Sequence, residues 1–245
     1  MAKPGWLTQH TPLIIGHRGA SADAPENTLA AFALALQQGA DGLELDVQLS
    51  ADGQPVVFHD SSLQRLSGRD ELCADLPLSE LQAVEVGTEE TIPSLHELFE
   101  MLGPQTLYNV ELKSFGLQNN GLVEAVAEVV ESHGLTAQVL ISSFNPLYVR
   151  RAREVFPAST LVALLRQPGW QQYAYLIADG EADHPHHTLV DESYMSWAGG
   201  RGYRIHVWTV DDPAEANRLA KLGVHGIITN KPGWLRRRLT PVEAS

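Results

Sequence analysis

The feature that most constrains this chain is a regular alternation of short strand-like runs with amphipathic helical segments. An apolar run at 13–16 ends in glycine, and apolar residues then recur at helical spacing through 25–40. At 42–49 the residues alternate, with Leu43, Leu45 and Val47 on the opposite face from Glu44 and Asp46. Strands that alternate with helices of this length indicate parallel βαβ units.

The same alternation continues to the C-terminal end. Further strands are predicted at 106–113, 138–144, 159–165, 204–210 and 224–230, with a weak one at 187–190. Helices are predicted at 78–86, 93–102, 122–133, 145–156, 171–177, 212–223 and 231–239. Eight repeats in 245 residues favour a single-domain (β/α)8 TIM barrel spanning 1–245 over an open sheet. The run at 55–60 is an extra strand, and 61–91 is expected to be a small excursion.

Charge and composition exclude several kinds of partner. A formal net charge of −13 argues against nucleic acid, since such binding depends on clustered Lys and Arg. The single cysteine, Cys73, permits no disulfide framework and fits a reducing compartment. No apolar run approaches the length of a membrane span, and we expect a cytoplasmic protein. The sequence carries no signal for an oligomeric state.

Charged and titratable residues stand where the predicted strands end. His17 and Arg18 end the first strand, and Glu111 shares a strand face with Lys113. The extra run at 55–60 carries His59. Because the active site of such a barrel lies at the C-terminal ends of its strands, we expect these side chains to converge there.

Three of the converging groups are carboxylates: Glu44, Asp46 and Glu111. Ligands that are all oxygen suit a hard cation, Mg²⁺ or Ca²⁺, and without a cation the three would raise one another's pKa values. The alternative from spacing alone is that they are ordinary polar positions around a barrel mouth.

The remaining groups also have two interpretations. His17 and His59 suit a general acid and base pair, or they are hydrogen-bonded structural histidines. Arg18 and Lys113 either pair with the carboxylates or hold the oxygens of an anionic phosphate. Taken together, the groups favour phosphoryl chemistry. A second histidine cluster is interpreted as a solvated loop rather than a zinc site, because it has no helical pair and no cysteine: His184, His186 and His187.

The motifs of this chain strongly resemble those of the glycerophosphodiester phosphodiesterase family. The resemblance rests on "GHRGA", "PENTLAAF" and "GADGLELDVQLSADGQPVVFHD" and continues through "NVELK", "SSF", "VWTV" and "GIITNKP". It therefore covers nearly the whole chain. It implies a TIM barrel that hydrolyses a small-molecule glycerophosphodiester to glycerol 3-phosphate and an alcohol with one divalent cation.

The resemblance also implies roles for individual residues. His17 of the HRG motif and His59 of the HD motif would be catalytic. Glu44 and Asp46 of the ExD motif, with Glu111 of the ExK motif, would hold the metal ion. The nucleophile would be either the glycerol 2-hydroxyl, giving a cyclic phosphate, or water.

Other matching positions would contact the substrate. Arg18 and Lys113 would bind the phosphate, and Phe144 and Trp208 would wall the glycerol or the leaving alcohol. In the ENT motif Glu26 would order the mouth of the site, with Asn27 beside it.

Two departures stand in the last strand, where the family usually has aspartate at the positions of His225 and Asn230. We interpret both as lying outside the metal and acid–base set.

Two other functions compete. A lysophospholipase D or sphingomyelinase-D-like phosphodiesterase would need an apolar groove, for which the candidate aromatic residues are Phe144, Trp170, Trp197 and Trp208. A non-catalytic barrel that binds a phosphodiester would be expected to lack a histidine or a metal ligand, whereas this chain keeps the full set.

Overall fold

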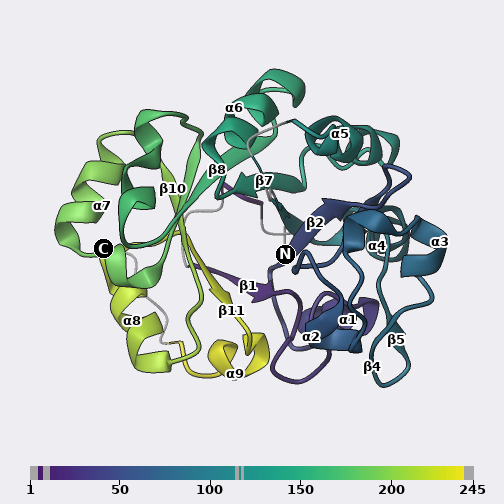
Figure 1. The fold of residues 1–245 in the computed structure, drawn as a ribbon. Coiled ribbons are helices and arrows are strands. Elements are labelled where there is room, and N and C mark those ends of the chain that lie inside the picture. Colours follow the sequence, from purple (N-terminus) through teal and green to yellow (C-terminus); the bar gives the residue numbers. More distant parts are fainter. Residues whose placement is uncertain (1–4, 8–11, 114–115, 117–118, 240–245) are drawn as a thin grey trace.

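The computed structural model describes residues 5–7, 12–113, 116 and 119–239, and these form a closed barrel of parallel strands surrounded by helices (Figure 1). Its eight strands are β1 (Leu13–His17), β2 (Gly42–Leu49), β6 (Leu107–Leu112), β7 (Val139–Ser143), β8 (Leu161–Arg166), β9 (Ala182–Pro185), β10 (Arg204–Val207) and β11 (Gly226–Thr229). The first strand closes the ring, since β1 pairs in parallel with both β2 and β11. The predicted (β/α)8 barrel is confirmed.

The segments between the strands are mostly helical. The main helices are α1 (Leu29–Gln37), α4 (Leu95–Leu102), α5 (Leu122–Ser132), α6 (Pro146–Val155), α7 (Glu192–Gly199), α8 (Pro213–Leu222) and α9 (Pro232–Arg236). Their starts follow ordinary capping chemistry: Asn145 caps α6 ahead of Pro146, and Asp212 caps α8. Between β8 and β9 the predicted helix is a 3₁₀ turn, η3 (Trp170–Leu176).

Side chains alternate along the strands, so that one apolar layer lies between the barrel and the helices and another fills the interior of the barrel. On β2, Leu43, Leu45 and Val47 are fully buried in a cluster that includes Phe32 of α1. The interior of the barrel is filled by a second cluster: Trp6, Leu13, Ile15, Leu107, Leu140, Ala163, Ala182 and Ile228. Because this cluster is packed, polar side chains on the inward face gather above it, at the carboxyl ends of the strands.

The predicted extra strand is β3 (Pro55–Val57), which pairs antiparallel with β2. The excursion that follows holds α2 (Gln64–Ser67), η1 (Cys73–Asp75), α3 (Leu78–Leu81), β4 (Glu85–Gly87) and β5 (Glu90–Thr91). Its apolar side chains, among them Leu63, Cys73 and Val84, pack with Phe58. The prediction of one helix over 78–86 is wrong, because only its first turn is helical before the chain enters the β4–β5 hairpin.

Two further expectations are also wrong. The strand expected at 187–190 lies earlier, at β9, and His187–Leu189 forms a 3₁₀ turn. Consequently His184 is not in a solvated loop. It is fully buried inside the barrel, with its Nε2 3.0 Å from Nδ1 of His206. Its strand, with the sequence ADHP, has too few β-branched or aromatic residues to reveal itself.

None of the helices in the described part of the chain is both long enough and apolar enough to cross a membrane.

Candidate active site

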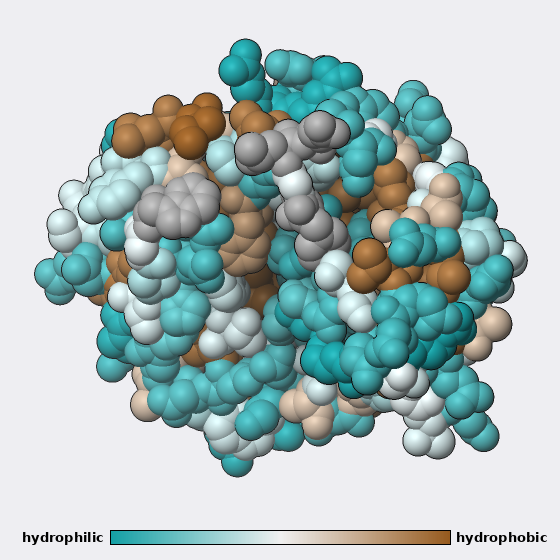
Figure 2. All heavy atoms as spheres, in the orientation of Figure 1, coloured by the Kyte–Doolittle hydropathy of each residue, from teal (hydrophilic) through white to brown (hydrophobic). Residues whose placement is uncertain are grey.

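A cavity of about 270 Å³ opens at the carboxyl ends of the strands. In the orientation of Figure 1 it corresponds to a hollow near the centre of the ring of strands (Figure 2). Its walls combine cations, carboxylates and histidines with apolar side chains: His17, Arg18, Glu44, His59, Asn109, Glu111, Lys113, Phe144, Leu165, Gln167, Trp208, Thr209 and Ile228. The cavity therefore gathers most of the predicted site residues.

The turn after β1 places Arg18 by an unusual backbone conformation. Arg18 has a φ of 54°, and Gly19 has a φ of 87°. A Cβ on Gly19 would lie 2.5 Å from the carbonyl carbon of Ala31, so only glycine fits there. The Arg18 amide donates to the Glu44 carbonyl oxygen at 2.9 Å and to Glu44 Oε2 at 3.0 Å. A left-handed non-glycine residue at a site of this kind is a local strain that the surrounding structure must hold.

The acidic cluster is buried. Glu44, Asp46 and Glu111 each offer a carboxylate oxygen, and these atoms lie within 4.8 Å of one another. Glu44 Oε1 is buried and accepts no hydrogen bond. Burial, together with the charges of Asp46 and Glu111, raises the pKa of Glu44 well above its ordinary value. An unpartnered buried carboxylate oxygen beside two further carboxylates fits a hard divalent cation.

Two cations lie against this cluster. Lys113 Nζ is 2.7 Å from Glu111 Oε1 and 3.3 Å from Asp46 Oδ1. Arg18 Nε is 3.0 Å from Asp46 Oδ2, which also accepts a hydrogen bond from Asn27 at 2.8 Å. Burial alone would raise the pKa of Asp46, but Lys113 and Arg18 hold it below its ordinary range. Asp46 therefore stays ionised.

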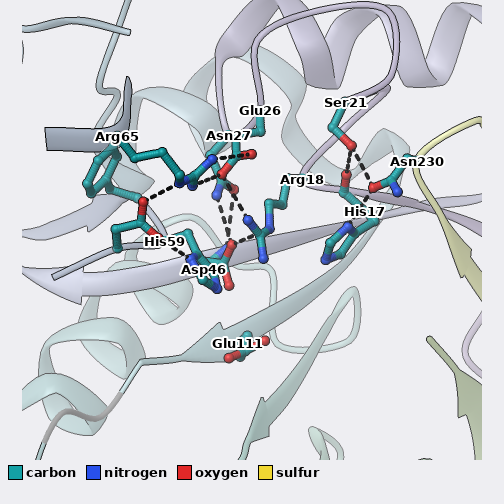
Figure 3. A network of polar contacts seen from close by, with 12 residues as sticks. His17, Arg18, Ser21, Glu26, Asn27, Asp46, His59, Arg65, Glu111 and Asn230 are labelled. Atoms are coloured by element: carbon teal, nitrogen blue, oxygen red, sulfur yellow. Dashed lines mark hydrogen bonds and ion pairs between the residues drawn. The ribbon is translucent and has the colours of Figure 1, made fainter. Parts of the chain in front are cut away.

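His17 is held by two residues that the sequence did not associate with it. Its Nδ1 is 2.7 Å from Oδ1 of Asn230, and the Asn230 side-chain amide donates to Asp211 at 2.7 Å. Ser21 Oγ also lies 2.8 Å from Asn230 Oδ1 (Figure 3). Asn230, interpreted from the sequence as lying outside the predicted metal and acid–base set, therefore contacts one predicted member of that set directly, the imidazole of His17.

The second histidine has a different neighbour. His59 Nδ1 lies 2.6 Å from Oδ1 of Asp60, and Asp60 in turn accepts a hydrogen bond from Arg65. Burial would raise the pKa of Asp60, but Arg65 and His59 lower it, so the carboxylate is ionised. Arg65 also bonds Glu26, which pairs with Arg18 at 2.8 Å (Figure 3).

Fewer of the candidate aromatic residues line the cavity than the sequence suggested. Phe144 and Trp208 line the cavity, with ring centroids 5.3 Å apart in an edge-on arrangement. Trp197 does not join them, since it packs between Tyr175 and Tyr203 away from the cavity. The side chain of Trp170 lies outside the described part of the structure.

A cavity that brings two histidines and two cations beside a buried carboxylate cluster, at the mouth of a (β/α)8 barrel, has the fold and the groups expected of a phosphodiester hydrolase. The family model of the glycerophosphoryl diester phosphodiesterases matches residues 17–234, and the chain belongs to this family. It is an enzyme of the glycerophosphodiester phosphodiesterase class.

Individual relatives agree with the family match. A glycerophosphodiester phosphodiesterase of Caldanaerobacter subterraneus is 35% identical over 91% of this chain and 96% of its own. Among solved structures, an Oleispira antarctica phosphodiesterase in complex with the product sn-glycerol-3-phosphate is 32% identical, with a TM-score of 0.82 over 93% of this chain and 96% of its own. A glycerophosphodiester phosphodiesterase of Thermotoga maritima is 28% identical, with a TM-score of 0.77 over 94% and 99%.

Proposed function

We propose that this enzyme hydrolyses glycerophosphodiesters to glycerol 3-phosphate and an alcohol, with one divalent cation and two catalytic histidines. The observation that carries the proposal is the buried, unpartnered carboxylate oxygen of Glu44 in the same cavity as His17 and His59. The Oleispira relative, which was solved with sn-glycerol-3-phosphate, supports the product.

Glu44, Asp46 and Glu111 would hold Mg²⁺ or Ca²⁺, and a bound cation would offset the charge that grows on the phosphoryl oxygens. Arg18 and Lys113 line the cavity beside this cluster and would bind the phosphate oxygens.

We assign His17 as the general base. Because Asp211 accepts from the Asn230 side-chain amide, Oδ1 of Asn230 faces His17 and accepts the proton of Nδ1. The other ring nitrogen, Nε2, is then left with its lone pair. Burial and the neighbouring charge of Arg18 lower the pKa of His17. A neutral ring whose Nε2 carries no proton is the state that a base requires, and this atom lies 3.9 Å from Glu44 Oε2.

We assign His59 as the general acid. The ionised carboxylate of Asp60 accepts from Nδ1 at 2.6 Å and orients the ring. His59 would donate its Nε2 proton to the oxygen of the leaving alcohol as the P–O bond breaks. The proton from the attacking glycerol 2-hydroxyl, or from water, would pass to His17. Attack by the 2-hydroxyl would have the advantage of a reactant already in place, and it would give a cyclic phosphate that water then opens to glycerol 3-phosphate.

The remaining predicted residues have supporting roles. Phe144 and Trp208 would wall the glycerol or the leaving alcohol. Asn27, with a φ of 58°, would hold Asp46 by its 2.8 Å hydrogen bond, and Glu26 would orient Arg18.

The affinity for the cation is expected to fall as the pH is lowered. Burial, with the charge of Asp46, raises the pKa of Glu111 to about 7, and the pKa of Glu44 is also raised. Because a carboxylate must lose its proton to bind a metal, affinity should weaken about tenfold or more between about pH 8 and pH 6. Titration calorimetry with Mg²⁺ and with Ca²⁺ at both pH values checks this, and equal affinities would contradict it.

The function is tested with purified protein and paired substrates. We expect release of glycerol 3-phosphate from glycerophosphocholine to exceed hydrolysis of lysophosphatidylcholine under the same conditions. The reverse order would favour a lysophospholipase D, the name carried by a human relative that is 26% identical. Folded protein without turnover on either substrate would favour a binding barrel. Phosphorus NMR during turnover distinguishes a cyclic phosphate from direct attack by water.

A further inference from the structure

We propose that Arg65 is a positioning residue of this active site. It would fix the Asp60 carboxylate against His59, and Glu26 against Arg18. The proposal rests on the function proposed above. It also assigns a catalytic purpose to the excursion that interrupts the barrel repeat.

The guanidinium of Arg65 donates hydrogen bonds to two carboxylates at once (Figure 3). Its Nε donates to Oδ2 of Asp60, while Oδ1 of the same carboxylate faces His59 Nδ1. Its Nη2 donates to Glu26 Oε1 at 2.6 Å and its Nη1 to Glu26 Oε2 at 3.1 Å. Such paired, charge-assisted bonds fix both the position and the plane of a carboxylate.

Each of the two carboxylates contacts, and so orients, a different side chain of the cavity. Asp60 contacts His59, the proposed acid, and Glu26 Oε1 contacts Arg18 Nη1 at 2.8 Å. Arg65 itself is not among the residues that line the cavity. It therefore acts on the acid and on the phosphate-binding arginine through their partners, without contact to the substrate.

The excursion anchors Arg65 firmly enough for this role. The residue lies on α2, and Leu63 just before the helix is fully buried in the cluster that contains Phe58 and Cys73. Backbone bonds from Leu63 to Glu71 and from Cys73 to Ser61 close the segment on itself. Although the side chain of Arg65 is 48% exposed, its guanidinium is held by hydrogen bonds and ion pairs to the carboxylates of Asp60 and Glu26.

The same segment offers a matched control. Arg69 is similarly exposed and pairs with Glu71 at 2.7 Å, a carboxylate that does not line the cavity. Substitution of Arg69 removes the same charge from the same segment without touching His59 or Arg18.

The test compares R65A, R65K and R69A with the wild-type enzyme on glycerophosphocholine. For R65A we expect kcat to fall about tenfold to a hundredfold, as is typical when an outer partner of a functional group is lost. R65K keeps the charge but loses the paired hydrogen bonds of the guanidinium, and it should retain more activity than R65A. Guanidinium ion added to R65A should restore part of kcat. R69A should resemble the wild type with and without guanidinium.

A second readout separates positioning from a general loss of structure. If Arg65 serves the acid, R65A should lose less activity on a glycerophosphodiester with p-nitrophenol as leaving group, because a good leaving group needs little protonation. Turnover of R65A equal to that of R69A would overturn the proposal, as would a loss that is independent of the leaving group and not rescued by guanidinium. A wild-type enzyme without turnover would instead overturn the proposed function.

Discussion

Substitution of either His17 or His59 with alanine is expected to lower kcat by about a hundredfold to ten-thousandfold while the fold is retained. The two imidazoles line the same cavity, and each is oriented through Nδ1 by a different partner, Asn230 for His17 and Asp60 for His59. The loss follows because each ring would transfer one proton in the transition state.

The two variants should also differ from one another. H59A should recover much of its loss on a substrate with p-nitrophenol as leaving group, whereas H17A should not, because the nucleophile still needs a base. Steady-state kinetics on both substrates measures this difference. The matched control is H133A, since His133 contacts His96 on the outer surface. Reversal of the leaving-group effect would exchange the two assignments, and near-normal turnover of either folded variant would contradict both.

The substitution E44Q is expected to have two opposite effects. The amide keeps the shape of the side chain but removes a charged ligand from the cluster. Activity should therefore fall about a thousandfold, because a cation held there would supply several kcal/mol of transition-state stabilisation. The metal-free protein, in contrast, should become more stable by about 1–3 kcal/mol.

The sign of the stability effect follows from the direction of the pKa shift. Burial and the charges of Asp46 and Glu111 raise the folded-state pKa of Glu44 above its unfolded value. Its favourable contribution is therefore present at low pH and is lost as the pH rises through the folded-state pKa. Near neutral pH a glutamine at this position carries no charge, so the variant avoids the free-energy cost of an ionised carboxylate in the buried cluster. Thermal unfolding with and without cation measures both states, and E128Q, at an exposed position on α5, is the control. A metal-free E44Q less stable than the wild type would contradict the account.

The barrel was predictable because its strands carry strong local signals. On β2 the alternation of Leu43, Leu45 and Val47 with Glu44 and Asp46 indicated both the strand and the face that carries the acidic side chains. β9 lacked such a signal, because its sequence ADHP contains one small residue, a proline and two polar side chains. Those polar groups are paired only in the fold: Asp183 with Arg166, and His184 with His206.

The predicted site residues met in one place because strand ends converge, but their partners could not be predicted in the same way. Asn230 is 213 positions from His17, and its role depends on the closure of the barrel between β1 and β11. Arg65 lies on a four-residue helix, too short for its periodicity to show which way a side chain points. Its pairing with Glu26, 39 positions away, depends on how the excursion packs.

The most direct test of the account is release of glycerol 3-phosphate from glycerophosphocholine by protein treated with chelator and then given Mg²⁺ or Ca²⁺ separately, with E44Q measured in parallel. Chelation is expected to abolish turnover, one of the two cations is expected to restore it in the wild type, and neither is expected to restore it in E44Q. Full turnover of the chelated wild type, or equal restoration in E44Q, would contradict the central claim that Glu44, Asp46 and Glu111 hold a catalytic cation.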